Sequence, residues 1–281
     1  MSDAETRHGR ARQGGLVKKL KVIQLVYSNF MLTLPPKLLI NTGQRVLHLI
    51  AFQVRNLLRA LCSVGKPVPA QFAITTVILA GGLGTRIGGA KGLQLLHGRT
   101  LIGWVLDAVS RQSGEVLINV NAEHDAYACF GRRIIADQTP DWAGPLAGLQ
   151  SAMHYACHDW VASVPCDTPF LPDDLMARLS AALRTNVTEA AVAVVEGRRQ
   201  PTVALYHQSV LPRLDAYLAS GGRRVRDWQD TLHLSEVEFD NALAFTNINS
   251  LDDLTQANRI APEDFARMAG ATGAPITTKR K

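Results

Sequence analysis

The chain has 281 residues, of which 47% are apolar, so its composition is that of a globular protein with one or two domains. Its net charge of +6 comes from residues 1–72, which contain eleven Lys and Arg but only two Asp and Glu, whereas residues 73–281 contain nineteen basic and twenty-two acidic residues. Because the basic charge lies outside the main part of the chain, it does not indicate a nucleic-acid-binding protein.

The sequence divides into three regions. We expect residues 1–72 to be a basic extension that is partly helical or disordered, residues 73–260 to form the main domain, and residues 261–281 to be a tail. The extension has three interpretations: a wrongly chosen start codon, a helical segment that contacts a partner or a membrane surface, and a targeting peptide. No uncharged apolar run reaches the roughly 20 residues that span a bilayer. The four cysteines follow no disulfide spacing, so we expect a cytoplasmic protein.

From residue 73 onward, short apolar segments alternate with amphipathic ones. The pattern predicts strands at 74–80, 115–120, 133–136, 160–165, 190–195, 202–206 and 245–248. It predicts helices at 101–109, 146–156, 172–183 and 209–218, and a last one after Asn249 or Ser250. Such alternation indicates an α/β fold with a Rossmann-like, mostly parallel sheet covered by helices on both faces. Ligands of such folds bind at the carboxyl ends of the strands.

A glycine-rich loop follows the first predicted strand directly. Residues 79–92 include six glycines together with Arg86 and Lys91. Glycines let backbone N–H groups approach an anion closely, and the two cations suit phosphate oxygens. The loop is not a Walker A motif, because no Ser or Thr follows Lys91, and Ile87 replaces the third glycine of the dinucleotide fingerprint. The alternative is a loop that only joins a strand to a helix.

A single carboxylate, Asp167, follows the strand predicted at 160–165 and is flanked by prolines. One carboxylate at a strand end suits Mg²⁺, which keeps several waters and binds one or two carboxylates together with substrate phosphates. The alternative is that Asp167 only caps the next helix, although Asp173 and Asp174 are better placed for capping.

Two further strand ends carry polar side chains. Asp137 ends the strand at 133–136, and Gly144 and Pro145 then turn the chain into a helix. Asn119 and Asn121 lie at the end of the strand at 115–120, and an Asn there could bind a base edge or a ribose hydroxyl. Each has a purely structural alternative, namely turn formation for the first segment and a polar strand end for the second.

Taken together, these segments resemble the molybdenum cofactor guanylyltransferases, a family of the nucleotide-diphospho-sugar transferase-like fold. The resemblance covers residues 76 to 257 and rests on five motifs in order: Leu79-Ala80-Gly81-Gly82, Arg86 before Gly88-Gly89, Lys91-Gly92-Leu93, Gly144-Pro145-Leu146-Ala147-Gly148 and Pro165-Cys166-Asp167-Thr168-Pro169. Single motifs recur in sugar-phosphate nucleotidyltransferases, whereas the whole set in this order is much more specific.

The resemblance implies transfer of GMP from GTP to molybdenum-bearing molybdopterin with release of pyrophosphate, so that GTP and the molybdopterin cofactor are the substrates and a molybdoenzyme or its chaperone is a candidate partner. It implies that Asp167 binds Mg²⁺, and we expect Lys91, Arg86 and Asp167 to be the catalytic residues because they would neutralise the charge of the triphosphate. The implied GTP contacts come from Leu79, Ala80, Gly81, Lys91, Asn119, Asp137 and Asp167. On the pterin side the resemblance points to residues 221–224, with Arg223 and Arg224 as candidate phosphate ligands, and to residues 247–249.

The loop departs from the family pattern, because residues 88–91 are one residue shorter and lack the Asp that usually precedes the Lys. Two other classes of function stay open. One is a cytidylyl- or sugar-phosphate nucleotidyltransferase of the same fold, and the other is a non-catalytic GTP-binding chaperone that delivers the cofactor. Turnover with different nucleoside triphosphates distinguishes the first, and GTP binding without pyrophosphate release would indicate the second.

Overall fold

The computed structural model describes residues 73–81, 90–138, 144–183 and 188–260. The expectations for residues 1–72, for the tail at 261–281 and for Arg86 lie outside the described residues. Within them, none of the helices is long and apolar enough to cross a bilayer.

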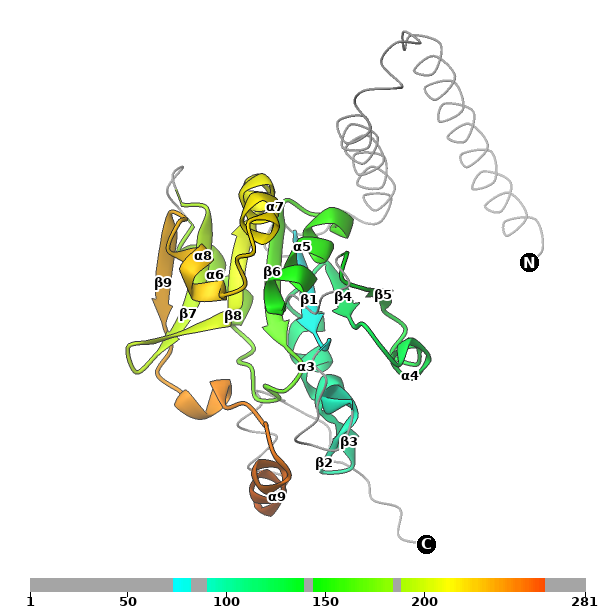
Figure 1. The fold of residues 1–281 in the computed structure, drawn as a ribbon. Coiled ribbons are helices and arrows are strands. Elements are labelled where there is room, and N and C mark those ends of the chain that lie inside the picture. Colours follow the sequence, from blue (N-terminus) through cyan, green and yellow to red (C-terminus); the bar gives the residue numbers. More distant parts are fainter. Residues whose placement is uncertain (1–72, 82–89, 139–143, 184–187, 261–281) are drawn as a thin grey trace, which may run out of the picture. The chain divides into compact units, whose positions relative to one another are not determined.

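A seven-stranded sheet forms the centre of the described part (Figure 1). Its strands are β1 (Ile74–Leu79), β4 (Glu115–Asn119), β5 (Arg133–Ile135), β6 (Trp160–Pro165), β7 (Ala190–Val195), β8 (Arg198–His207) and β9 (Leu234–Glu238). Their order across the sheet is β5-β4-β1-β6-β8-β7-β9. Only β8 runs antiparallel to its two neighbours, so the predicted mostly parallel sheet is confirmed.

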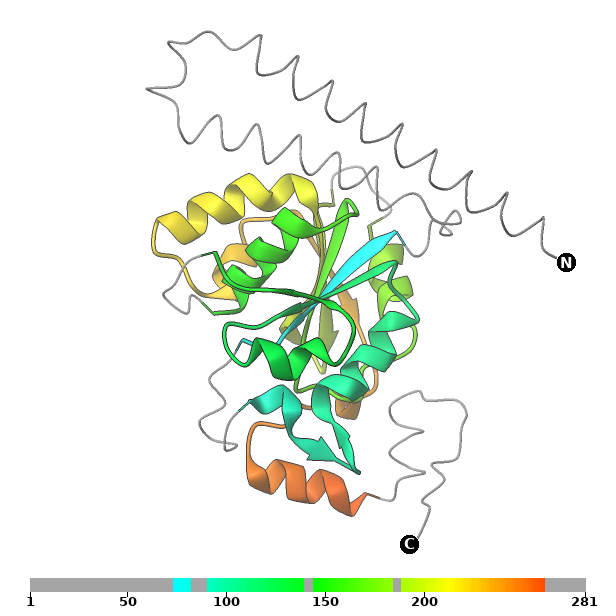
Figure 2. The same ribbon diagram turned by 90° about the vertical axis from the view of Figure 1, so that its right-hand side faces the viewer.

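Helices cover both faces of the sheet, with α5 and α7 on one face and α3 and α6 on the other (Figure 2). Their bounds are α3 Leu101–Ser110, α5 Pro145–Tyr155, α6 Leu175–Ala181 and α7 Leu211–Ala219. Shorter elements are α4 (His124–Ala128), α8 (Val225–Gln229), η3 (Lys91–Leu93), η4 (Gln208–Val210) and η5 (Ala242–Phe245). This is the doubly covered architecture that the sequence predicts.

Two hydrophobic cores form because the side chains of each strand alternate between the two faces of the sheet. In β1, Ile74 and Ile78 pack with α3 and α6, whereas Val77 packs on the other face with α5 and α7. All six residues of β7 are buried, as expected for a strand covered on both sides.

A third, smaller cluster lies beyond the carboxyl edge of the sheet. It joins the hairpin of β2 (Leu95–Leu96) and β3 (Arg99–Thr100) to α9 (Leu251–Arg259). The two elements lie side by side in both ribbon views, and the His97 N–H donates to Asn258 Oδ1 at 2.9 Å (Figures 1 and 2). Ser250 caps α9 through a capping box with Asp253. Ser250 is one of the two residues that the sequence offers as the cap of this helix.

Two sequence predictions about local structure are wrong. The strand predicted at 245–248 is instead the end of η5 followed by irregular chain, in which the Ile248 N–H donates to the Asp167 carbonyl at 2.9 Å. The helix predicted from Pro172 begins only at Leu175, and the cap residue Asp174 makes no side-chain capping bond. In the second place Gln112 Nε2 donates to the Pro172 carbonyl at 2.9 Å, so at both places a residue distant in sequence binds the backbone.

Most of the other elements fall where they are predicted. β6 and β7 have the predicted bounds, and α7 ends shortly before Gly221, whose φ of 87° needs a glycine. β8 begins at Arg198, four residues before the predicted start, and β9 has no counterpart in the prediction. β9 is a partly exposed edge strand with the sequence Leu-Ser-Glu-Val-Glu, whose weak apolar pattern explains the omission.

Candidate active site

The carboxyl ends of the central strands meet at one cavity of ≈ 380 Å³. Its lining comes from the ends of β1, β4, β5 and β6, from the start of α5 and from β8: Leu79, Ala80, Gly81, Lys91, Asn119, Asn121, Asp137, Gly144, Pro145, Pro165, Cys166, Asp167 and Thr202. Every GTP-contact residue that the resemblance implies is therefore at this cavity. Arg86, the remaining candidate, lies outside the described residues.

The end of β1 is held between its two neighbours. The Ala80 N–H donates to the Asn119 carbonyl at 2.9 Å, and the Cys166 N–H donates to the Leu79 carbonyl at 3.1 Å. A Cβ atom on Gly81 would lie 3.0 Å from Asn121 Nδ2, so the glycine allows the chain to pass close to that amide. These contacts continue the sheet into the cavity and fix the start of the glycine-rich loop.

Lys91 and Asp167, which both line the cavity, form an ion pair. Their side chains are 18% and 10% exposed, so water screens the pair only partly. The Lys91 ammonium also donates to Asn249 Oδ1 at 2.5 Å. Asn249 belongs to the segment 247–249 to which the resemblance points on the pterin side, and the structure brings it to within hydrogen-bonding distance of the catalytic candidate Lys91.

Asp137 is held by two asparagines at the far side of the cavity. Asn119 Nδ2 donates to Asp137 Oδ1 at 2.9 Å, and Asn121 Nδ2 donates to Asp137 Oδ2 at 2.8 Å. The Asp137 N–H in turn donates to Asn121 Oδ1 at 2.9 Å. The three side chains therefore form one rigid group with the carboxylate at its centre. Asn119 is the last residue of β4 and Asn121 follows two positions later, so both amides come from the strand end that the sequence singles out, whereas the resemblance implies a GTP contact for Asn119 alone.

The segment around Asp167 is rigid because its neighbours are bonded to a distant part of the chain. Thr168 Oγ1 donates to Asn247 Oδ1 at 2.7 Å, next to the bond between Ile248 and the Asp167 carbonyl. Burial, followed by the charge of Asp167, raises the pKa of Cys166 to about 12. This thiol is therefore protonated at neutral pH and is not a nucleophile.

Arg223 and Arg224 do not line the cavity in the described structure. Arg223 Nη1 donates to the carbonyls of Leu218 at 3.0 Å and Gly222 at 2.8 Å, where it satisfies the last turn of α7. Both arginines are exposed. Their role as acceptor-phosphate ligands stays a prediction.

Thr202 is a cavity residue that sequence reasoning missed. It lies on β8, beside the end of β6, and its carbonyl accepts a hydrogen bond from Ser163 Oγ at 2.9 Å. No sequence signal distinguishes it from other strand threonines, because its place at the cavity depends on the pairing of β8 with β6.

The site combines a glycine-rich strand end, a shielded lysine and a carboxylate at the carboxyl edge of a mostly parallel α/β sheet. This combination is typical of a site that binds a phosphate-bearing ligand. The model of the MobA-like NTP transferase domain matches residues 76–235, and the chain belongs to this family.

Similar proteins carry one recurring name. A molybdenum cofactor guanylyltransferase of Cupriavidus metallidurans is 46% identical over 187 residues, which cover 64% of this chain and 92% of that protein. A molybdenum cofactor guanylyltransferase of Burkholderia lata is 45% identical over 203 residues, which cover 69% of this chain and 99% of that protein.

Solved structures share the fold at lower identity. The molybdopterin-guanine dinucleotide biosynthesis protein A of Archaeoglobus fulgidus has a TM-score of 0.58 and 24% identity, covering 67% of this chain and 99% of that one. A CMP:2-keto-3-deoxy-manno-octonic acid synthetase complexed with CTP has a TM-score of 0.55 and 14% identity, covering 69% of this chain and 100% of that one. These two likenesses show the nucleotidyltransferase fold of the domain.

Proposed function

We propose that this chain transfers GMP from GTP to the terminal phosphate of molybdenum-bearing molybdopterin and releases pyrophosphate. The observation that carries the proposal is the Lys91–Asp167 pair, which lies in the same cavity as the Asp137 group at the carboxyl ends of the strands. The choice of acceptor is supported by relatives of 45–46% identity that are named for this reaction.

The Asp137 group supports GTP as the nucleotide. A carboxylate only accepts hydrogen bonds, and guanine carries two adjacent donors, its N1–H and its 2-amino group. Asn119 and Asn121 fix the carboxylate oxygens of Asp137 and leave further lone pairs for a ligand in the cavity. Cytosine, adenine and uracil each present a different order of donors and acceptors at the equivalent edge, so they match this carboxylate less well.

The residues around Asp167 suit a magnesium ion. Oxygen atoms of Asp167 and Asn249 already surround one cation, the Lys91 ammonium, and both are hard ligands of the kind that Mg²⁺ prefers. No group of three or more His, Cys, Asp or Glu side chains that could hold a metal converges within the described residues, which fits an ion shared with substrate phosphates. When bound, Mg²⁺ neutralises phosphate charge and stabilises the charge that develops on the leaving pyrophosphate.

The transfer itself needs no protein nucleophile. An oxygen of the acceptor phosphate, already ionised at neutral pH, forms a bond to the α-phosphorus of GTP, while the bond from that phosphorus to the bridging oxygen breaks. The electron pair leaves with pyrophosphate, so no proton has to move in this step. Lys91, Arg86 and N–H groups of the glycine-rich loop would hold the triphosphate in line and neutralise its charge, and positioning with charge stabilisation would account for the catalysis.

Pyrophosphate release in the presence of molybdenum-bearing molybdopterin and each of GTP, CTP, ATP and UTP tests the proposal. We expect turnover with GTP and formation of a guanine dinucleotide. Turnover with CTP instead would establish a cytidylyltransferase, and tight GTP binding without pyrophosphate release would establish a cofactor chaperone.

A further inference from the structure

An irregularity in β8 lies directly at the cavity. The pairing of β8 with β7 runs from Ala190↔Tyr206 to Val192↔Ala204 and resumes only at Val194↔Arg199. One residue of β7 therefore faces four residues of β8, numbers 200–203, and the pairing of β8 with β6 also ends at Ala204. We call residues 200–203 the β8 bulge. Bulges of this kind often redirect a side chain at a functional site, and this one contains the cavity residue Thr202.

Two buried side chains, rather than backbone groups of a neighbouring strand, donate hydrogen bonds to the bulge. Gln229 Nε2 donates to the Pro201 carbonyl at 3.0 Å, and Ser163 Oγ donates to the Thr202 carbonyl at 2.9 Å. Gln229 is fully buried, and Ser163 is 3% exposed. The two successive carbonyls of the bulge are therefore satisfied by side chains from α8 and β6, which fixes the bulge against both elements.

The two donors belong to one buried network. Gln229 Nε2 also donates to Tyr206 Oη at 2.7 Å, and the Tyr206 hydroxyl has Ser163 as a further hydrogen-bond partner. The Pro201 carbonyl can only accept, so the amide nitrogen of Gln229 must face it. Gln229 Oε1 meets no hydrogen-bond partner among the described residues. The contribution of this amide to the described structure thus comes from its two N–H groups.

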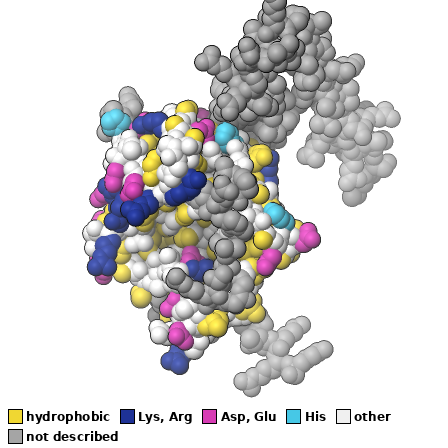
Figure 3. Space-filling model, viewed as in Figure 1, with side chains coloured by type: hydrophobic (Ala, Val, Ile, Leu, Met, Phe, Trp, Pro, Cys, Tyr) yellow, Lys and Arg dark blue, Asp and Glu magenta, His cyan; other side chains and the backbone are white. Residues whose placement is uncertain are grey.

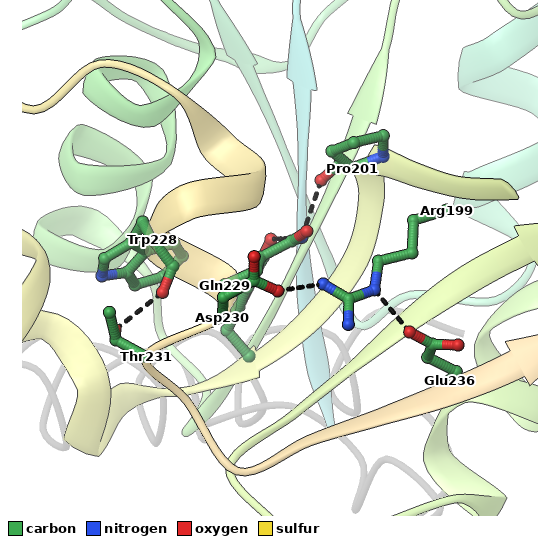
Figure 4. A network of polar contacts seen from close by, with 8 residues as sticks. Arg199, Pro201, Trp228, Gln229, Asp230, Thr231 and Glu236 are labelled. Carbon is green, nitrogen blue, oxygen red and sulfur yellow. Dashed lines mark hydrogen bonds and ion pairs between the residues drawn. The ribbon is translucent and has the colours of Figure 1, made fainter.

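The end of α8 also fixes the start of the bulge. Asp230, which follows Gln229 directly, forms an ion pair with Arg199, and Arg199 Nε contacts Glu236 Oε1 on β9 at 2.5 Å. Figure 4 shows these contacts together, with Gln229 pointing to Pro201 and Asp230 to Arg199. The last residue of α8 therefore holds the backbone at residue 201, and the cap residue that follows it holds the side chain of Arg199.

The order of the strands assigns the bulge to one side of the reaction. Asp137 follows β5 at one end of the cavity, Asp167 follows β6, and Thr202 lies on β8 beyond it. If the base lies at Asp137 and the reacting phosphate at Asp167, then Thr202 lies on the side from which the acceptor enters. Figure 3 shows several Lys and Arg side chains close together on one face, and the exposed arginines at and beside α8 are Arg223, Arg224 and Arg226, a charge that favours an anionic acceptor.

We propose that the β8 bulge forms a wall of the acceptor subsite, and that Gln229 and Ser163 are positioning residues that hold it in place. This inference rests on the proposed function, because it needs an acceptor distinct from the nucleotide. It assigns to Thr202 a direct contact with the acceptor, and to Gln229 and Ser163 an effect on acceptor binding through the backbone of residues 201–202.

The test compares Gln229→Met and Ser163→Ala with the wild-type full chain in steady-state kinetics. We expect the KM for molybdenum-bearing molybdopterin to rise about five- to tenfold in each, the factor that corresponds to one lost hydrogen bond, while the KM for GTP changes less than about twofold. The matched control is Gln208→Met. Gln208 is also a buried glutamine whose Nε2 donates to a backbone carbonyl, that of Met153 at 2.7 Å, and whose Oε1 has no partner among the described residues, but it does not line the cavity.

Gln208→Met should leave both KM values unchanged. The inference is overturned if Ser163→Ala or Gln229→Met raises the KM for GTP as much as the KM for the acceptor, or raises neither. It is also overturned if Gln208→Met raises the KM for the acceptor by the same factor. Should Gln229→Met fail to fold, Ser163→Ala decides alone, because Ser to Ala removes one buried hydroxyl and little volume. A wild-type chain without turnover would refute the proposed function. An active wild type whose Gln229→Met and Ser163→Ala variants keep the wild-type KM for the acceptor would refute only the role of the bulge.

Discussion

Replacing Gly148 by Ala tests how closely α5 must approach the sheet at the cavity. A Cβ atom at this position would lie 2.3 Å from Asn119 Oδ1 and 2.7 Å from Leu79 Cδ2. In an ordinary helix interior, Gly to Ala stabilises by about 1 kcal/mol. Overpacking of a buried contact costs about 1–3 kcal/mol, so we expect a net loss of up to about 2 kcal/mol in the free energy of unfolding.

The same change should weaken GTP binding, because Asn119 must move to make room for the new methyl group. Asn119 holds the carboxylate of Asp137 at 2.9 Å, and a hydrogen bond to a charged group contributes about 1.5–3 kcal/mol. Since about 1.4 kcal/mol corresponds to a tenfold change in affinity, we expect the Kd for GTP to rise at least about tenfold. Calorimetric titration with GTP and Mg²⁺ measures this, and thermal unfolding measures the stability.

Ser151→Ala on the same helix is the matched control. Ser151 is fully buried, and its hydroxyl has no hydrogen-bond partner among the described residues, so its loss should change neither stability nor GTP affinity appreciably. If Gly148→Ala binds GTP as tightly as Ser151→Ala and is equally stable, the close approach of α5 to Asn119 does not shape the nucleotide site.

The remaining predictions concern the charged pair, a helix cap and a thiol. Asp167→Ala and Lys91→Ala should each abolish most turnover while far-UV circular dichroism stays native, and near-normal GMP transfer by either variant would refute their roles. Ser250→Ala removes the side-chain cap of α9 and should cost about 1 kcal/mol, seen as a melting temperature lower by about 2–4 °C; an unchanged value would show that the capping box does not stabilise α9. Because burial raises the pKa of Cys166 to about 12, this thiol stays protonated and should resist iodoacetamide at mildly alkaline pH. The exposed Cys129 should react under the same conditions, and peptide mass spectrometry measures both. Rapid alkylation of Cys166 in the folded protein would contradict its burial.

The sequence predicts the central strands well because each is a short apolar run with a clear boundary. β6 ends at Pro165 and β7 at the Glu196–Gly197 turn, and both strands have the predicted bounds. β8 is different, since its first residues are polar and contain Pro201, so the predicted strand begins only inside the bulge, at Thr202. The pairing of β8 with β7 resumes at Arg199 because of contacts with β7 and β9 and because of the ion pairs of the Arg199 side chain. No local sequence pattern predicts these contacts.

In the candidate site, too, some residues follow from the local sequence pattern and others depend on contacts between distant parts of the chain. Lys91, Asp137 and Asp167 are predicted because each follows a strand whose carboxyl end must face the cavity. The contact between Lys91 and Asn249 joins residues 158 positions apart, and it exists because the segment before α9 packs against Asp167. The same segment was predicted as a strand, since composition alone cannot distinguish an apolar strand from irregular chain that is held by side-chain hydrogen bonds.

The most direct test of the proposed function is the release of pyrophosphate by the full chain with molybdenum-bearing molybdopterin and one nucleoside triphosphate at a time. We expect release with GTP that depends on the acceptor and on Mg²⁺, matched by formation of the guanine dinucleotide and lost in the Asp167→Ala variant. Release that is equal for all four nucleotides, or GTP binding with no release, would contradict the assignment.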